Sequence, residues 1–442
     1  MRFKPYPKYK PSGVEWLGEV PMHWGATRLK RISDVRLSNV DKHTVEGQQA
    51  IKLCNYVDVY KNNRITSKID FMVASASDEQ IARLTLAKGD VIITKDSETP
   101  SDIGVPALVD EGISDLVCGY HLALIRPTSS LGQYLSYLFQ SHFVRSVFEV
   151  EATGMTRYAL GKYSIENLSF TAPTVDEQSA IATFLDRETA KIDTLISKQE
   201  KLIELLKEKR QAIISHAVTK GLNPKAKMKD SGIEWLGEVP EHWDVRRLST
   251  LTTKITNGYV GPTRDILVDS GIRYLQSLHI KENRISFDPP YYVDNEWSVQ
   301  HSKSILAKED VLVVQTGDIG QAACISDEFI GCNCHALIIL SPKRGTVIGE
   351  WISWGLNSDY GFNTLLSIQT GALHPHLNCG NVKDVAIPLP PVDEQNKIID
   401  YLKSEMGKID GLITKSKIAI ELQIEHRSAL ISAAVTGKID VR

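Results

Sequence analysis

One thirteen-residue phrase occurs twice in this chain of 442 residues, and this repeat limits the possible folds more than any other feature of the sequence. SGVEWLGEVPMHW begins at Ser12, and SGIEWLGEVPEHW begins 219 positions later at Ser231, with two letters changed. Other pairs follow in the same order at offsets between 215 and 220, including LAKGDVIIT with LAKEDVLVV and PTVDEQSAIATFLD with PPVDEQNKIIDYLK. An offset kept from end to end indicates two copies of one structural unit.

Each copy has three parts, namely the phrase, a body of about 150 residues and a long periodic segment. In the bodies, DVIIT, LALI, DVLVV and ALIIL are short runs rich in apolar and β-branched residues, which predict buried strands. LGQYLSYLFQSHFVRSVF and GEWISWGLNSDYGFNTLL carry apolar residues at helical spacing. Each body is therefore predicted to combine strands and helices.

The periodic segments follow a heptad pattern. With Ile181 at an a position, seven of the ten a and d positions up to Ile213 are apolar, and the second segment keeps the same steps from Ile398 to Leu430. The polar interruptions also coincide, pairing Glu188 with Glu405, Gln199 with Ser416 and Lys209 with His426. We expect two helices of about 36 residues, about 54 Å long at 1.5 Å per residue, that pair antiparallel and fix each other's register. An ordinary surface helix is the competing interpretation.

The predicted fold class is therefore α/β (α+β), with two globular mixed domains in tandem. Two long helices forming an antiparallel coiled coil separate them, in a pseudo-twofold and near-circular arrangement with adjacent chain ends. The predicted boundaries are 1–174 for the first domain, 175–220 for a central helical spacer, 221–391 for the second domain and 392–442 for a distal helical spacer.

Composition excludes some functions and leaves others open. The chain has 51 Lys and Arg against 54 Asp and Glu, so its net charge of -3 gives no global signature of nucleic-acid binding, and any such role must rest on local patches. The six cysteines form no regular framework, which favours a reducing compartment. No segment reaches the roughly 18 consecutive apolar residues that a membrane span needs, so we expect a cytoplasmic protein that does not contact a membrane.

Two similar domains joined by a spacer suit a target that is itself periodic and twofold. Duplex DNA is the commonest such target, and dimeric readers use identical subunits on its two half-sites. Because the two bodies have diverged, we expect them to read different half-sites. The expected target is therefore bipartite and asymmetric.

The ordered set of motifs resembles the DNA-specificity subunit of type I restriction-modification systems over essentially the whole sequence. GEVPMHW and GEVPEHW open the two halves, and PTVDEQSAIATFLD and PPVDEQNKIIDYL open the two helices. The resemblance implies that each body is a target-recognition domain reading a few base pairs of double-stranded DNA. It also implies that the paired helices set the gap, and that the helices and repeated segments dock two modification (methyltransferase) subunits and, through them, restriction/translocase subunits.

The same resemblance implies a non-catalytic chain within a complex that methylates adenine and cleaves DNA. No cofactor is expected on this chain, whereas S-adenosylmethionine, ATP and Mg are expected on the partner subunits. Two alternatives remain open, a stand-alone adenine methyltransferase and a coiled-coil adaptor without nucleic acid.

Three short motifs bear on these alternatives. DPPY at Asp288 matches the catalytic tetrapeptide of amino-methyltransferases, but no Gly-rich cofactor loop precedes it and the first copy has RITSKIDFMV at this place. CNCH, with Cys332 and Cys334, lacks the paired ligands of a structural zinc site. TGDIG lacks the lysine and spacing of a phosphate-binding loop. We predict no catalytic residues and no metal site.

Three loops offer candidate DNA contacts because they differ between copies of a constant framework. VIITKDSETPSDIG and VLVVQTGDIG leave matching strands and rejoin at Ile-Gly, but the first is four residues longer. TGMTRYALGK and TGALHPHLN hold equal places later in each copy, and the third pair is RLSNVDKHT with TNGYVGPTRD. The candidates are Lys42, Lys95, Ser97, Thr99, Arg157 and Lys162 in the first copy, and Arg264, Gln315, Thr316 and His374 in the second.

The repeated phrase contains no plausible catalytic set. We interpret Trp16, Pro21 and Trp24 as anchors of a chain turn. The second copy directly follows the first predicted helix, and the first copy should lie where the antiparallel second helix ends. Each phrase is therefore expected to hold its domain against a helix end.

Overall fold

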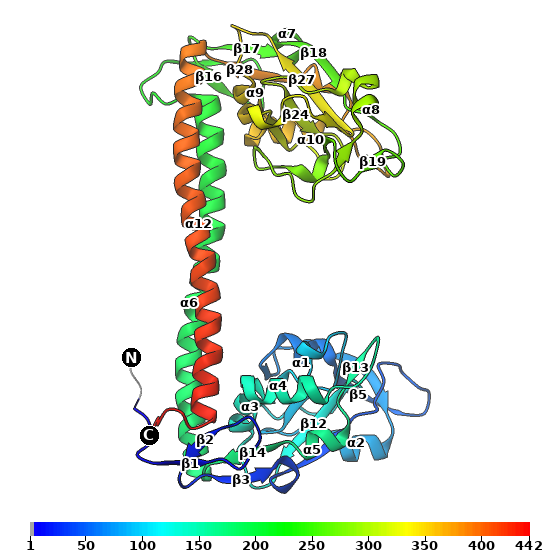
Figure 1. Ribbon diagram of the computed structural model, residues 1–442, viewed down its shortest axis with the longest axis vertical. Helices are drawn as coiled ribbons and strands as arrows, with labels where there is room; N and C mark the ends of the chain where they lie inside the picture. The colour runs from blue at the N-terminus through cyan, green and yellow to red at the C-terminus, as the bar shows by residue number, and fades with distance from the viewer. Residues whose placement is uncertain (1–3) are drawn as a thin grey trace. The chain divides into compact units, whose positions relative to one another are not determined.

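The computed structural model describes residues 4–442. The chain divides into two compact units, of which the first contains the described residues up to Glu200 together with Lys417–Arg442, and the second contains Lys201–Ser416. The long helices α6 (Val175–Lys220) and α12 (Val392–Val435) each contribute to both units (Figure 1). None of the helices in this described part of the chain is long and apolar enough to cross a membrane.

The first unit is built on a central sheet of five strands. Their order is β4 (Ser33–Leu37), β12 (Leu122–Pro127), β8 (Val91–Thr94), β10 (Pro106–Val109) and β6 (Arg64–Ile65). Neighbours are antiparallel except β10 and β6, which are parallel. A second sheet has the order β11 (Leu116–Cys118), β5 (Gln49–Cys54) and β7 (Met72–Ala76).

Helices and short strand pairs complete this unit. The helices are α1 (Tyr56–Lys61), α2 (Asp78–Leu84), α3 (Gly132–Gln140), α4 (His142–Glu151) and α5 (Lys162–Glu166). The paired short strands are β1 (Tyr9–Pro11) with β2 (Glu19–Pro21), β3 (Gly25–Arg28) with β14 (Ser169–Ala172), and β9 (Asp96–Ser97) with β13 (Tyr158–Ala159).

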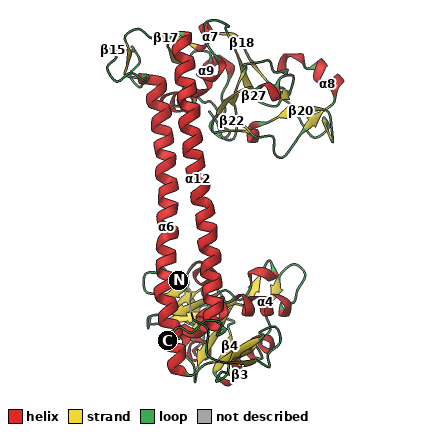
Figure 2. Cartoon of the chain, turned by 60° about the vertical axis from the view of Figure 1, so that its left-hand side comes forward, coloured by secondary structure: helices red, strands yellow, loops and turns green. Residues whose placement is uncertain are grey.

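The second unit repeats most of this topology, with four strands in its central sheet and four in its second sheet. Its central sheet has the order β18 (Thr252–Asn257), β27 (Leu337–Pro342), β24 (Val311–Val314) and β25 (Ala322–Cys324), and its second sheet the order β19 (Leu267–Val268), β23 (Tyr292–Val293), β20 (Ile272–Leu275) and β26 (Asn333–Cys334). The remaining strand pairs are β15 (Met228–Asp230) with β16 (Glu238–Pro240), β17 (Asp244–Arg247) with β28 (Ala386–Leu389), and β21 (Ile280–Lys281) with β22 (Arg284–Ile285). Its helices are α7 (Leu248–Leu251), α8 (Asn295–Gln300), α9 (Gly349–Leu356), α10 (Asp359–Ser367) and α11 (Cys379–Val382). Figure 2 labels the first three of them.

The central strands are buried on both faces, as their continuous apolar runs predict. Successive side chains of a strand point to opposite faces, so Val91 and Ile93 enter the core shared with α3, α4 and α6, whereas Ile92 enters the core beneath the second sheet. In the second unit Val311 and Leu312 divide in the same way. The predicted mixed α/β architecture in two copies is confirmed.

The two long helices run antiparallel within each unit. In the first unit, Arg427 of α12 pairs with Asp193 of α6 at 3.0 Å, and in the second, Arg210 of α6 pairs with Asp410 of α12 at 3.1 Å. Apolar residues of both helices meet in the core of each unit. The helices have 46 and 44 residues, longer than the predicted 36, because their last turns add apolar residues to the cores and their first turns bond to the bodies through Gln178 and Gln395.

Each repeated phrase holds a helix end, as predicted, through its second tryptophan. Trp24 and Trp243 are fully buried. A Cβ at Gly437, just after α12, would lie 2.3 Å from Pro21, and one at Gly221, just after α6, would lie 3.1 Å from Trp243. Both glycines have positive φ angles, of 74° and 73°, which favour glycine for a second reason.

Residues near the chain ends are adjacent, since the amide of Asp440 donates to the carbonyl of Lys4 at 2.8 Å.

The interpretation of Trp16 as an anchor was wrong, because this residue is 63% exposed. It lies in the turn before β2.

Candidate nucleic-acid interface

In the first unit, two of the three predicted loops come together. Ser97 pairs with Tyr158 and Asp96 with Ala159 in the β9 and β13 ladder, and the amide of Leu160 donates to the carbonyl of Lys95 at 2.8 Å. The four extra residues of the first loop provide room for β9 and for a 3-10 turn, Pro100–Asp102. The ladder therefore places the loop after β8 beside the hairpin that carries Arg157.

A chain of charged groups connects these two loops. Asp96 accepts from Lys95 at 2.9 Å and contacts Nδ1 of His121 at 2.7 Å, while Nη2 of Arg157 lies 3.4 Å from Nε2 of the same histidine. Burial opposes ionisation of Asp96, but the hydrogen bonds from His121 and Lys95 outweigh it and lower the pKa of this carboxyl. The result is an ionised Asp96 that holds Lys95 of its own loop and His121, which in turn contacts Arg157 of the hairpin.

Aromatic side chains border this network. Tyr56 and Tyr60 of α1 stack with ring centroids 5.5 Å apart, and Tyr60 donates to Asp102 at 2.7 Å. Tyr120 is 42% exposed, and the centroid of its ring lies 3.5 Å from that of His121. Sequence reasoning did not select Asp96, His121 or these tyrosines, although a histidine just before the same strand in both copies was a usable signal.

The other predicted residues of this unit differ in their accessibility. Ser97 is buried, and its hydroxyl oxygen accepts from the amide of Thr99, so it shapes the loop, whereas Thr99 itself is exposed. Lys162, at the start of α5, is exposed and pairs with Glu166 at 3.4 Å. Lys42 is also exposed, but its loop bonds to β7 through Ser75 and not to the other two loops.

The second unit brings the corresponding loops together. The amide of Leu377 donates to the carbonyl of Gln315 at 3.0 Å, and Thr370 bridges His376 as Thr153 bridges Ala159 in the first unit. His374 is exposed at the tip of this hairpin and Thr316 is exposed after β24. Arg157 and His374 therefore hold equal places, as the alignment of the copies predicts.

Neutral and aromatic groups dominate this second surface. Tyr259 lies 5.0 Å from both Trp297 and His301, whose rings stack at 4.0 Å, and 6.4 Å from His335. Burial lowers the pKa of His335 and favours its neutral form. Arg264, five residues after Tyr259 in the same loop, is exposed. The Oε1 atom of Gln315 is buried without a hydrogen-bond partner among the described residues.

The two surfaces offer hydrogen-bond donors, acceptors and ring faces of the kinds that contact bases and phosphates. Among residues 4–442, no group of three or more His, Cys, Asp or Glu side chains is arranged to hold a metal ion. In the DPPY motif, the carbonyl of Pro289 accepts a hydrogen bond from the buried His279 at 2.9 Å. This contact gives the motif a structural role.

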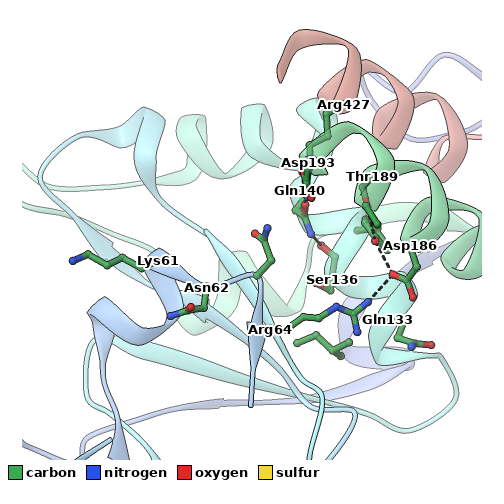
Figure 3. A pocket seen from close by; sticks show the side chains of 14 residues that line it. Lys61, Asn62, Arg64, Gln133, Ser136, Gln140, Asp186, Thr189, Asp193 and Arg427 are labelled. Carbon is green, nitrogen blue, oxygen red and sulfur yellow. Dashed lines mark hydrogen bonds and ion pairs between the residues drawn. The ribbon is translucent and has the colours of Figure 1, made fainter. Parts of the chain in front are cut away.

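A groove of about 390 Å³ marks the junction between the first body and the helices. Figure 3 shows Arg64 of β6 directed toward Asp186 of α6, and its Nη2 atom contacts this carboxylate at 2.6 Å. The Nη1 atom of Arg64 lies 2.9 Å from Asp110. Arg427 pairs with Asp193 and donates to Gln140 at the same junction. Most charges of the groove are paired with one another, so it orients the body on the helices.

The second unit has a groove at the equivalent place, where Arg284, the counterpart of Arg64, pairs with Asp410. Asp410 also pairs with Arg210, which contacts Glu282 at 2.7 Å. The junction therefore keeps its position in both units while its ion pairs differ.

Comparison with known proteins gives the family. The chain matches the type I restriction modification DNA specificity domain over residues 31–205 and again over 240–422. It belongs to this family, and the predicted resemblance is confirmed.

Relatives and structures agree with this assignment. The MjaX relative from Methanocaldococcus jannaschii, a provisionally assigned type I restriction enzyme specificity subunit, is 23% identical over 431 residues and matches 96% of both chains. The StySPI specificity subunit of Salmonella potsdam is 22% identical and matches 96% of this chain and 90% of its own. A chain from a structural study of complex assembly and conformational transition in the type I R-M system shares the fold, with a TM-score of 0.72 at 15% identity over 94% of this chain and 98% of that one.

The chain is a non-catalytic DNA specificity subunit of a type I restriction-modification enzyme. DNA and the modification and restriction subunits are the partners that this assignment implies. The comparisons give no support to a stand-alone methyltransferase or to an adaptor without nucleic acid.

Proposed function

We propose that each unit reads one half of an asymmetric bipartite DNA site with the paired loops described above. The observation that carries this proposal is the same juxtaposition in both units, a loop after the central strand tied to a hairpin tip, with different side chains in each. A constant framework with variable polar tips is the usual design of recognition loops. Arg157 and His374 are the proposed leading contacts.

The side chains differ enough to predict different modes of reading. Lys95 and Arg157 can contact guanine or phosphate. In the second unit, Gln315 is a residue of the type that can bond adenine bidentately. We therefore propose that electrostatic attraction contributes more at the first half-site than at the second.

We further propose that the paired helices set the gap between the half-sites. Support comes from the continuity of α6 and α12, each of which contributes to both units. Two modification subunits would dock on this chain and restriction/translocase subunits on them, with S-adenosylmethionine, ATP and Mg bound by these partners. The specificity chain would hold no cofactor itself.

The test is to map methylated adenines by single-molecule sequencing after modification by the complete complex. Replacing residues 95–99 with the corresponding loop of a relative is expected to change one half of the motif only. The matched replacement of 315–316 is expected to change the other half only. A change in both halves from either replacement, or a purified chain that methylates DNA unaided, would contradict the proposal.

A second arm tests the gap. Deleting 196–202 from α6 and the opposed 418–424 from α12 removes seven residues, nearly two turns, and so keeps the apolar faces aligned. At 1.5 Å per residue this shortens each helix by about 10 Å, which corresponds to about three base pairs at 3.4 Å each. An unchanged gap would refute the role of the helices.

A further inference from the structure

The repeated phrase contains a tryptophan that the fold does not explain. Trp24 and Trp243 are fully buried, so packing accounts for their presence in both copies. Trp16 and Trp235, by contrast, are 63% and 64% exposed. Tryptophan is enriched among the residues that dominate binding energy at protein interfaces. Two copies of a largely exposed tryptophan at the same place therefore indicate a binding surface that occurs twice.

Each exposed tryptophan borders a groove on the second helix of its body. In the first unit, Trp16 lines a groove of about 410 Å³ with Phe143, Val147 and Val150 of α4. Val150 is 66% exposed, and Tyr163, on the same groove, is 75% exposed. The apolar surface that Trp16 offers thus continues along one face of α4.

In the second unit, Trp235 lines a groove with Tyr360, Asn363 and Leu366 of α10. The two helices correspond, since each follows a serine, Ser141 or Ser358, whose hydroxyl caps it. Phe143 and Tyr360 each stand two residues after this serine. The two grooves are therefore equivalent surfaces of the repeated unit.

The charge of the grooves restricts the partner. The charged side chains that line the first groove are Glu15 and Glu151, and Asp359 lines the second, where Glu234 precedes Trp235. Neither groove has a Lys or Arg among its described lining residues. Arg28 and Lys30 donate to Asn167 at the edge of the first groove, but the charged side chains that line the two grooves are acidic and favour a partner with cationic groups beside an apolar anchor.

We propose that the two grooves dock two copies of one protein segment, which inserts an apolar side chain beside the tryptophan and places Lys or Arg against the flanking glutamates. The assignment of this segment to the modification subunit rests on the proposed function. Equivalent grooves, one on each unit, give a stoichiometry of two partner subunits to one specificity chain. The loops proposed to read DNA are not part of these grooves.

The experiment counts modification subunits by native mass spectrometry on the full-length chain mixed with the modification subunit from the same organism. The unaltered chain is expected to bind two. Trp16→Ala and Trp235→Ala are each expected to weaken one site at least tenfold and to leave one subunit bound, and the double variant none. Glu15→Lys and Glu234→Lys are expected to act in the same direction. Val73→Ala, at a site on β7 that is 67% exposed and outside both grooves, is the control and should retain two.

Thermal unfolding shows whether each variant folds, and folded single variants that keep two subunits at unchanged affinity would overturn the inference. An unaltered chain that binds fewer than two would do so as well. Methylation mapping of the unaltered complex is read separately. A complex of two subunits and one chain that modifies no bipartite motif would refute the proposed function alone, whereas a correct motif with unaffected tryptophan variants would refute the docking surface alone.

Discussion

Glu177 and Gln178 are adjacent polar residues that are both buried, and the side chain of each has hydrogen-bond partners within the first unit. Glu177 accepts from Tyr6 at 2.7 Å and contacts His23 at 2.8 Å, whereas Gln178 accepts from the amide of Leu131 at 3.0 Å. Buried polar groups need such partners, because an unpaired one costs about 1–3 kcal/mol. In the second unit, Glu394 and Gln395 repeat the contacts, with His242 and with the amide of Ile348. The repeated VDEQ motif thus joins helix, phrase and body.

His279 gives a pH dependence whose sign follows from its environment. The ring is buried, with Nδ1 accepting from the amide of Gln276 and Nε2 donating to Pro289, which requires the neutral form. Burial lowers its pKa below the value of about 6.5 that applies in the unfolded chain. The unfolded state therefore binds a proton first as the pH falls, so stability present above about pH 6.5 is lost below it.

We expect the free energy of unfolding to fall between about pH 7.5 and 5.5, with up to about 1.4 kcal/mol per pH unit from this group. Urea unfolding at both pH values measures the change. His279→Gln should reduce the slope, without abolishing it because burial also lowers the pKa of His335. His374→Gln, at an exposed position, is the control and should leave the slope unchanged. Equal slopes for His279→Gln and the unaltered chain would contradict this assignment.

At the scale of elements, the register of the helix pair is marked by ion pairs that recur in both units. Arg427 with Asp193 and Arg210 with Asp410 occupy equivalent positions of the two copies. The two arginines are similarly buried, with Arg210 11% and Arg427 19% exposed, but Asp410 is 24% exposed against 51% for Asp193, and Arg210 also contacts Glu282. The two pairs should therefore contribute unequally, because solvent screens an exposed pair.

We expect Arg210→Met to cost about 1–3 kcal/mol, because it removes two charge-assisted hydrogen bonds, one of them to the partly buried Asp410. Arg427→Met should cost no more than about 1 kcal/mol, the upper end for exposed pairs. Chemical denaturation of both variants measures the difference, and double-mutant cycles with Asp410→Asn and Asp193→Asn isolate the pair energies. An equal cost at the two positions would contradict the assigned asymmetry.

At the scale of the whole molecule, residues near the two chain ends are in contact at the place where the second unit has a continuous link. Lys4 and Asp440 are hydrogen bonded beside the first phrase, and in the second unit residues 221–227 lead directly from α6 to β15. Asn223, in this link, is exposed. Both units thus have a junction between a helix end and the repeated phrase. The chain is interrupted at this junction in the first unit and continuous in the second.

A circular permutant that joins the present ends and opens at Asn223 is expected to fold and to direct methylation to the same motif. The physical reason is that the exchange of an interrupted for a continuous junction leaves the contacts of Trp24 and Trp243 in place. Thermal unfolding and methylation mapping measure the outcome. A permutant that folds but loses the motif would show that the position of the chain ends matters for recognition.

By itself, the sequence determined the duplication, the buried strands within DVIIT and DVLVV, the antiparallel helix pair and the family. Periodicity depends on neighbouring residues and the fixed offset on a comparison within the chain, so both can be detected without knowledge of the fold. The sequence also predicted correctly that Arg157 and His374 hold equal places in the two hairpins.

Only the tertiary structure decided which loops meet, because contacts between distant segments depend on strand pairing that no single segment encodes. The β9 and β13 ladder joins the first two loops and buries Ser97, whereas the loop of Lys42 lies against β7. The tertiary structure also decided that Trp24 is buried and Trp16 is exposed. Eight residues apart in one phrase, they differ because one reaches a core shared with two long helices and the other faces solvent.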